Sequence, residues 1–156
     1  MAQPSAYPRR RSARVILLSP DDEVLLIEFV VQRSDGEFAF WATPGGEIEG
    51  AETERAAAAR ELHEELNLAL PLDGPVHLVT SEFEHQGRVI LSTDVFFTAR
   101  CARSAPRLDA PTKAERDVMR RCRWWTLAEI ERSNDRIFPE DLGAVMRRIV
   151  PLDAAP

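Results

Sequence analysis

The sequence predicts a single mixed α/β domain. Apolar, β-branched runs typical of strands lie both before and after one long helical segment at residues 53–66, and shorter helical segments follow towards the C-terminus. Elements in this order form a sheet with helices packed on it. A chain of 156 residues has the length of one domain and buries about two-thirds of its unfolded surface, so its core requires no disulfide or structural metal.

The first third of the chain is expected to contain a tail, three short strands and a sharp loop. Residues 1–12 are rich in Pro and Arg without apolar periodicity, so we expect a flexible tail before a domain at residues 13–152. Apolar runs predict strands at residues 14–19, 24–32 and 38–41. Pro-Asp-Asp at residues 20–22 favours a hairpin between the first two runs. Thr-Pro-Gly-Gly at residues 43–46 predicts the loop.

The helix at residues 53–66 is the clearest element in the sequence. It consists mainly of Ala, Glu, Leu and Arg, which favour helices, and it contains no Gly or Pro. Asn67 follows, where a residue in the left-handed conformation often ends a helix. A loop is predicted at residues 70–75, and two more strands at residues 76–84 and 89–99.

The last third of the chain is expected to contain a loop, a buried segment and two helices. Residues 102–113 are polar and contain Pro, which predicts the loop. The segment 123–126 is expected to be buried, and Thr126 and Glu129 have the spacing of a capping box that opens a short helix. The last helix is predicted at residues 139–149, with a proline at its first position and arginines at its end.

Composition and charge exclude several classes of protein. The formal net charge of -6 argues against general nucleic-acid binding, which requires neutralisation of phosphates. No apolar run approaches the roughly 20 residues of a membrane helix, and no apolar stretch of a secretory signal follows the N-terminal arginines. Cys101 and Cys122 form no C-x-x-C pair, so we expect neither a zinc site nor a disulfide framework. We expect the protein to be located in the cytoplasm, where thiols stay reduced.

Glu61, Glu64 and Glu65 share one stripe of the predicted helix. At about 100° per residue, Glu65 lies about 40° to one side of Glu61, and Glu64 about 60° to the other. Like charges at these spacings each cost a few tenths of a kcal/mol, and no basic residue is expected on the stripe to relieve them. The stripe therefore indicates a divalent cation, for which oxygen ligands favour Mg²⁺ or Mn²⁺. A solvated acidic helix face is the alternative.

The residues before the helix add a second feature. Gly45 and Gly46 form a turn ahead of it, and Glu52 precedes Arg60 by eight positions. Across that spacing, an arginine on the helix can reach back to a carboxylate in the entering loop. Such a pair would fix the path of the loop.

Together these residues resemble the Nudix box. Residues 46–68 read GEIEGAETERAAAARELHEELNL, against the 23-residue pattern G-x5-E-x7-R-E-U-x-E-E-x-G-U, in which U is a bulky apolar residue. The matching residues are Gly46, Glu52, Arg60, Glu61, Leu62, Glu64, Glu65 and Leu68. Asn67 stands where the family has glycine, and Asn also tolerates the left-handed backbone. The flanking segments at residues 41–46 and 123–130 also fit, so the resemblance covers nearly the whole chain after residue 12.

The resemblance implies an α/β/α sandwich with a mixed sheet. It also implies metal-dependent hydrolysis of a nucleoside diphosphate linked to another group. The cofactor is expected to be Mg²⁺ or Mn²⁺, bound by the carboxylates of Glu61, Glu64 and Glu65. A backbone carbonyl of the Gly45–Gly46 loop, with Gly46 as the box residue, is expected to complete the coordination.

Catalytic roles are also implied by the resemblance. Glu61 and Glu64 are expected to ligate metal or form the base, and Arg60 to support them through an ion pair with Glu52. A general base can lie outside the box in this family, and Glu115 is the candidate here. The alternative for Glu115 is a surface residue in a loop.

Two aromatic residues are candidates for binding the nucleobase. Trp41 adjoins the Pro-Gly-Gly turn, and Phe138 begins a Phe-Pro-Glu-Asp segment that resembles a family loop near the substrate. Core packing is the alternative for both.

The substrate class is narrowed only by elimination. ADP-ribose hydrolases of the family are associated with a proline about 15 residues after the box, whereas residues 82–84 read Glu-Phe-Glu. Dinucleoside polyphosphate hydrolases are associated with a tyrosine slightly further on, and the single tyrosine here is Tyr7. A small nucleoside di- or triphosphate remains, including an oxidised one. The alternatives are a nucleotide-sensing module without turnover, an ADP-ribose or dinucleoside polyphosphate hydrolase, and an RNA-end hydrolase. The resemblance leaves homodimerisation open.

Overall fold

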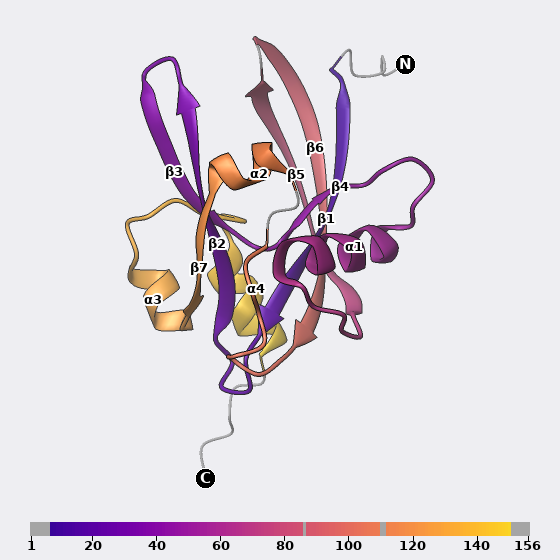
Figure 1. The fold of residues 1–156 in the computed structure, drawn as a ribbon, viewed down its shortest axis with the longest axis vertical. Coiled ribbons are helices and arrows are strands. Elements are labelled where there is room, and N and C mark those ends of the chain that lie inside the picture. The colour runs from indigo at the N-terminus through magenta and orange to yellow at the C-terminus, as the bar shows by residue number, and fades with distance from the viewer. Residues whose placement is uncertain (1–6, 86, 110–111, 151–156) are drawn as a thin grey trace.

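The computed structural model describes residues 7–85, 87–109 and 112–150. Figure 1 shows one mixed sheet with helices around it. The strands in the described residues are β1 (Arg9–Leu18), β2 (Val24–Arg33), β3 (Gly36–Ala42), β4 (Gly45–Glu47), β5 (Asp73–His85), β6 (Arg88–Arg100), β7 (Met119–Trp125) and β8 (Ile137–Phe138). The helices are α1 (Glu54–Leu66), α2 (Lys113–Val118), α3 (Leu127–Arg132) and α4 (Leu142–Ile149). Among these helices, none has the length and apolar character required to cross a membrane.

The sheet is mixed, as the sequence predicts. Its strand order is β5-β6-β1-β2-β3-β8, with β4 also paired to β1 and β7 to β2. β1 runs parallel to β6 and antiparallel to β2, and Leu18 and Val24 are partners at the end of the predicted hairpin. β1 therefore joins β2, which precedes α1 in the sequence, to β6, which follows α1.

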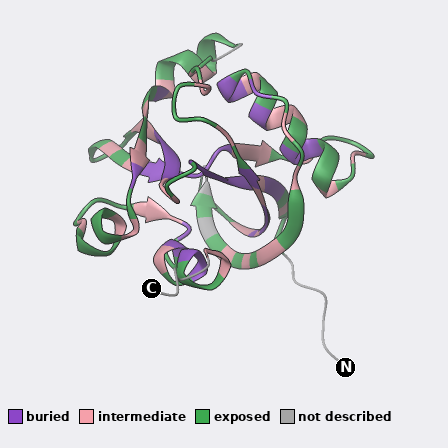
Figure 2. Ribbon diagram, turned by 90° about the horizontal axis from the view of Figure 1, so that it is seen from below, coloured by how far each residue is buried: buried purple, intermediate pink, exposed green. Residues whose placement is uncertain are grey.

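Alternation along β1 separates two cores. Val15 and Leu17 face the cluster that contains the apolar side of α1. Ile16 and Leu18 face the opposite cluster, which contains α4. Successive side chains of a strand point to opposite faces, so both faces of the sheet are covered. The result is the α/β/α arrangement, and Figure 2 shows buried residues where the helices face the sheet.

Helix α1 begins and ends almost where the sequence predicts. The side chain of Thr53 accepts a hydrogen bond from the backbone of Ala56 and caps the N-terminus. Asn67 adopts φ 56°, the left-handed conformation expected at the C-terminus. The structure thus accounts for asparagine at the position where the box usually has glycine.

Several expected boundaries are wrong. β1 begins at Arg9 and pairs with β6 along its whole length, so residues 9–12 belong to the sheet and not to a tail. Residues 1–6 and the expected domain end at 151–152 lie outside the described residues. β5 begins at Asp73, inside the expected loop, because Asp73 pairs with Thr98.

The C-terminal elements also differ from expectation. The last helix begins at Leu142 and not at Pro139, because the preceding residues Ile137 and Phe138 pair with β3 in extended conformation. The segment expected to be buried is the end of the longer strand β7, which pairs with β2, and only Trp125 in it is buried, since Arg123 and Thr126 are exposed. α3 is confirmed, with both hydrogen bonds of the capping box between Thr126 and Glu129.

Candidate active site

The glycine turn, formed by Gly45 and Gly46, packs between helix α1 and strand β1. Gly45 and Gly46 belong to β4 and pair with Arg14 and Ala13 of β1. Gly45 has φ 146°, and a Cβ atom there would lie 2.4 Å from the carbonyl oxygen of Ala13. A Cβ on Gly46 would lie 2.6 Å from a carboxylate oxygen of Glu61. Gly45 is therefore required by the backbone, whereas a side chain at position 46 would displace the carboxylate of Glu61.

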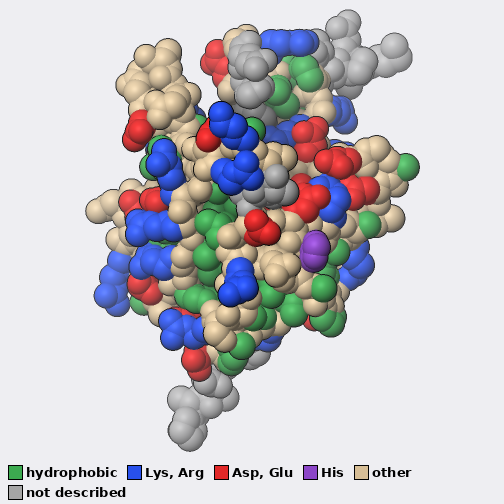
Figure 3. Space-filling view, in the orientation of Figure 1, with side chains coloured by type: hydrophobic (Ala, Val, Ile, Leu, Met, Phe, Trp, Pro, Cys, Tyr) green, Lys and Arg blue, Asp and Glu red, His purple; other side chains and the backbone are tan. Residues whose placement is uncertain are grey.

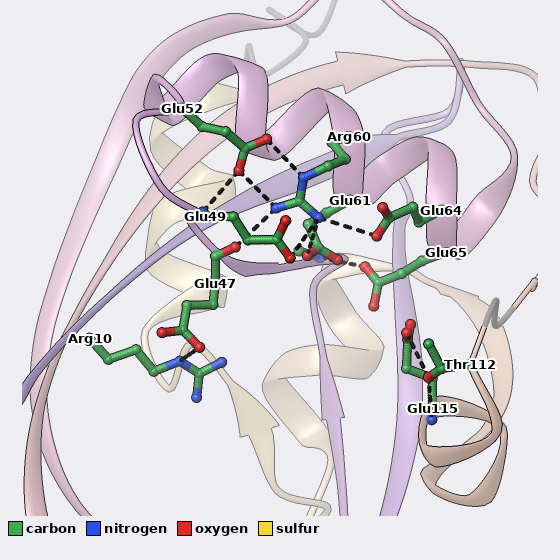
Figure 4. Close-up of polar contacts among 11 residues, drawn as sticks. Arg10, Glu47, Glu49, Glu52, Arg60, Glu61, Glu64, Glu65, Thr112 and Glu115 are labelled. Carbon is green, nitrogen blue, oxygen red and sulfur yellow. Dashed lines mark hydrogen bonds and ion pairs between the residues drawn. The ribbon is translucent and has the colours of Figure 1, made fainter.

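The predicted pair between Arg60 and Glu52 forms. Arg60 Nε lies 2.8 Å from Glu52 Oε2, and Arg60 Nη2 lies 3.0 Å from Glu52 Oε1 (Figure 4). Arg60 Nη2 also donates to the carbonyl oxygen of Glu47 at 3.0 Å. The hydrogen bonds from Arg60 hold the pKa of Glu52 below its usual value. The arginine therefore connects the helix to both ends of the loop that follows the glycine turn.

The expectation that no basic group relieves the acidic stripe is wrong. Arg60 Nη1 lies 3.0 Å from Glu61 Oε1 and 3.2 Å from Glu64 Oε2. One guanidinium group thus contacts four carboxylates, those of Glu49, Glu52, Glu61 and Glu64, because a long side chain at the edge of the stripe bends across it. Figure 3 shows acidic side chains gathered around α1 and the preceding loop, with basic groups among them.

Glu65 is the most deeply buried carboxylate of the cluster, with 4% of its surface exposed. Its Oε1 accepts a hydrogen bond of 2.7 Å from the backbone nitrogen of Gly45. Burial nevertheless raises the pKa of Glu65 to about 8, and the negative charge of Glu61 adds to this rise. Burial also raises the pKa of Glu61. Negative charge at these two groups is therefore costly in the protein alone.

Glu115 lies beside the same carboxylates, in the first turn of α2 and not in a loop. Its backbone nitrogen donates to the hydroxyl of Thr112, and that hydroxyl lies 2.9 Å from its carboxylate. Its charge contributes to the raised pKa values of Glu61 and Glu65, after the larger effect of burial. Figure 4 shows Glu115 below Glu65, reaching the site from the opposite side to α1. The structure therefore brings this candidate base to the box.

The donor set suits a hard divalent cation, although the side chains do not form a ready-made site. Among the described residues, no three His, Cys, Asp or Glu side chains converge to hold a metal. Glu61 and Glu64 are instead turned to Arg60. The available donors are carboxylate and carbonyl oxygens, which Mg²⁺ and Mn²⁺ prefer. A cation would also offset the cost of ionising Glu61 and Glu65.

A cavity of about 570 Å³ is lined in part by Arg14, which is the strand partner of Gly45 in the glycine turn. Its walls include the aromatic residues Phe38, Phe40 and Phe138. Phe138 lines the cavity and also packs against the core on the α4 side, so its contact with a nucleobase stays a prediction. The volume is within the range of about 300–1,000 Å³ typical of small-molecule sites.

Trp41 does not line this cavity. Its surface is 4% exposed, and its ring centroid lies 5.2 Å from that of Trp125 in the core on the α4 side. The alternation of β3 turns Trp41 inward, and the strand pairing with β8 covers its backbone. The structure thus gives Trp41 the packing role that was the alternative, and a stacking role is not supported.

Two of the charged residues that line the cavity, Arg14 and Asp94, form an ion pair that the sequence analysis missed, with a distance of 3.1 Å. Arg14 adjoins the apolar run at residues 15–18 of β1, and Asp94 adjoins the run at residues 95–97 of β6. A charge next to such a run was a signal that could have identified them. Their pairing could not be inferred, because it depends on the parallel register of strands 80 positions apart in sequence.

The site joins carboxylates suited to a divalent cation with a cavity suited to an organic ligand, as in hydrolases of phosphoric anhydrides. The sequence matches the family model of the NUDIX domain over residues 8–149, so the chain belongs to the Nudix family of pyrophosphohydrolases. Members of this family generally depend on divalent metal. No curated protein sequence matches the chain significantly.

Solved structures show the same fold. The MutT protein from Methanosarcina mazei Go1 is 17% identical, with a TM-score of 0.67, 93% of this chain covered and 95% of that one. A MutT NUDIX hydrolase from Burkholderia pseudomallei is 20% identical, with a TM-score of 0.66 and coverage of 90% and 98%. The NUDIX domain of Shewanella oneidensis NrtR, complexed with ADP ribose, is 19% identical, with a TM-score of 0.66 and coverage of 92% and 88%.

Proposed function

We propose that this protein hydrolyses the pyrophosphate linkage of a small nucleoside di- or triphosphate, including an oxidised one. The observation that carries the proposal is that Arg14 connects the cavity to the glycine turn that is bonded to Glu65. Arg14 lines the cavity and pairs with Gly45, whose nitrogen donates to Glu65. A nucleoside in the cavity would place its phosphates at the box. The volume of about 570 Å³ favours one nucleoside over two.

The box residues would hold the metal and prepare the attacking water. Glu61, Glu64 and Glu65, with a carbonyl of the glycine turn, are the proposed ligands of Mg²⁺ or Mn²⁺. A divalent cation bound there would neutralise phosphate charge and lower the pKa of a bound water. Arg60 would keep the turn in place through its bond to the Glu47 carbonyl.

The proton of the attacking water requires an acceptor at the site. Glu64 and Glu115 are the two proposed bases, because both reach the cluster and neither is buried. Thr112 holds the carboxylate of Glu115 at 2.9 Å and so limits its movement. A positioned base contributes about 10²–10⁴-fold to the rate.

The test is a substrate screen with purified protein. Nucleoside di- and triphosphates, 8-oxo-dGTP, ADP-ribose, dinucleoside polyphosphates and 5′-capped RNA are supplied with Mg²⁺ or Mn²⁺, and phosphate products are measured. We expect turnover of a mononucleotide that EDTA abolishes and either metal restores. Activity that survives exhaustive chelation contradicts the metal-dependent site. Nucleotide binding without turnover of any compound would identify a sensing module instead.

A matched pair of variants locates the activity. Glu61→Gln removes a proposed ligand and should lower turnover strongly. Glu54→Gln changes a glutamate of the same helix that pairs with Arg11 at 2.8 Å and is proposed to bind nothing else. It should therefore behave as the wild type. Equal losses in the two variants would mean that helix integrity, and not metal binding, accounts for the effect.

A further inference from the structure

Arg14 lies at the junction between the cavity and the carboxylate cluster. On the cavity side, its guanidinium carbon lies 5.3 Å from the centroid of the Phe138 ring. On the other side, a Cβ atom on Gly45 would lie 2.7 Å from Arg14 Cγ, and the nitrogen of Gly45 is bonded to Glu65. A ligand that fills the cavity and reaches the carboxylates must therefore pass this guanidinium group.

The guanidinium group is held by two fixed contacts. Nε lies 3.1 Å from Asp94 Oδ1, and Nη1 donates to the carbonyl oxygen of Thr43 at 3.2 Å. The side chains of Arg14 and Asp94 are 15% and 3% exposed, and the hydroxyl of Ser92 lies 3.5 Å from the other oxygen of Asp94. Within the described part of the chain, no acceptor is bonded to Nη2 of Arg14. This end of the guanidinium fork can therefore bind a ligand.

The chemistry of the surroundings favours an anionic ligand group at this point. The cluster beyond Arg14 carries several carboxylates, which repel an anion unless positive charge compensates them. Arginine binds phosphate through two parallel hydrogen bonds, whereas lysine acts as a point charge. On the other side, Phe40 and Phe138 can contact an uncharged ring, whereas the guanidinium carbon of Arg33 already lies 3.6 Å from the centroid of the Phe38 ring. The group that lies between ring and scissile linkage in a nucleotide is its first phosphate.

We propose that Arg14 binds the phosphate group nearest the nucleoside and that Asp94 is a positioning residue that presents the guanidinium group to it. This inference rests on the proposed function, since it places the nucleoside in the cavity. It makes the Arg14–Asp94 pair a determinant of selectivity for nucleotides over nucleosides. The contact would be made in substrate and product alike.

The experiment compares each nucleoside with its own 5′-monophosphate. Adenosine, guanosine, cytidine, uridine, 8-oxoguanosine and their monophosphates are titrated into the protein with Mg²⁺ present, and dissociation constants are measured by calorimetry. None of these probes contains a pyrophosphate, so none is consumed. We expect the wild type to prefer the monophosphate of the best-bound base. Arg14→Gln should reduce this preference by about 10-fold or more, as expected for a lost hydrogen bond between charged groups.

Two further variants separate charge from geometry. Arg14→Lys keeps the charge and should retain part of the preference. Asp94→Asn leaves the arginine in place but weakens its support, so it should lower the preference less than Arg14→Gln does. Because the preference is a ratio measured on one sample, a partly unfolded preparation does not change it. Arg147→Gln is the control, since Arg147 pairs with Glu131 at 2.7 Å and does not line the cavity.

The outcomes distinguish this inference from the proposed function. An Arg14→Gln variant with the wild-type preference overturns the inference and leaves Arg14 with a packing role. A wild-type protein that binds nucleosides and monophosphates equally also overturns it, while the nucleoside cavity stands. A wild-type protein that binds none of the probes contradicts the nucleoside cavity itself.

Discussion

The carboxylate of Glu65 accepts a 2.7 Å hydrogen bond from the backbone nitrogen of Gly45, which ties the end of α1 to the glycine turn. This bond joins residues 20 positions apart and places a buried carboxylate directly under the loop. The carboxylate is therefore both a structural acceptor and a proposed metal ligand. Its protonation should affect the stability of the metal-free protein.

We predict that Glu65 makes the metal-free protein less stable as the pH rises. Its pKa is raised from 4.5 to about 8 by burial, so between these values the folded state keeps a proton that the unfolded state loses. The contribution is complete below pH 4.5 and is lost as the pH passes 8, with a slope of at most about 1.4 kcal/mol per pH unit.

The measurement is the free energy of unfolding in EDTA from pH 5 to 8.5, for the wild type and Glu65→Gln. The neutral amide can still accept from Gly45, so the variant should gain stability relative to the wild type as the pH rises. Parallel curves would show that the carboxyl group is not the source of the slope.

Gly46→Ala should lower turnover by displacing Glu61. The added Cβ would lie 2.6–2.9 Å from three atoms of that carboxylate group, closer than a side chain tolerates. The comparison is Gly143→Ala in α4, where the nearest neighbour lies at an ordinary 3.5 Å. That change should keep full turnover and stabilise the helix by about 0.5–1 kcal/mol. Unimpaired turnover in Gly46→Ala would remove Glu61 from the proposed mechanism.

Arg60→Lys should retain the fold but reduce kcat. Lysine cannot reproduce the two parallel bonds to Glu52 together with the bond to the Glu47 carbonyl. The glycine turn should then lose its position, whereas KM for a nucleotide held in the cavity should change little. Steady-state kinetics at saturating Mg²⁺ provide the measurement. A rise in KM alone would indicate that Arg60 contacts the substrate directly.

Glu64→Gln and Glu115→Gln should identify the base. Loss of the base should lower kcat by about 10²–10⁴-fold, and by more where a metal ligand is lost as well. Glu64→Gln should also weaken Mg²⁺ binding, whereas Glu115→Gln should leave it nearly unchanged. Measurements of kcat and of the Mg²⁺ dependence for both variants test these roles. A near-normal kcat in Glu115→Gln assigns the base to the box, and a near-normal kcat in Glu64→Gln contradicts the box as the active site.

Local features of the site could be predicted from the sequence. The pairing of Arg60 with Glu52 and the left-handed Asn67 follow from spacing within one helix and its entering loop. The contacts of Arg60 with Glu61 and Glu64 were missed. A helical projection gives the direction in which a side chain leaves the helix, but not the position of the charged group at the end of a long side chain.

Features that depend on strand pairing could not be predicted. The Arg14–Asp94 pair requires the parallel register of β1 with β6, and the inward position of Trp41 requires the pairing of β3 with β8. The Arg-rich start of β1 resembled a tail for the same reason, since its strand partners are residues 91–94 of β6, far away in the sequence. Cytoplasmic location stays a prediction, and homodimerisation stays open.

Because the side chains of β1 alternate, the residues that line the cavity can be substituted separately from those that support α1. Even-numbered residues, Arg10 and Arg14, line the cavity, whereas Ala13, Val15 and Leu17 pack under α1. A substitution at an even position can thus alter what the cavity accepts while the seat of the carboxylate helix stays intact. Point mutations at these positions can therefore change the ligand that is bound, while the apolar residues that support the carboxylate helix stay unchanged.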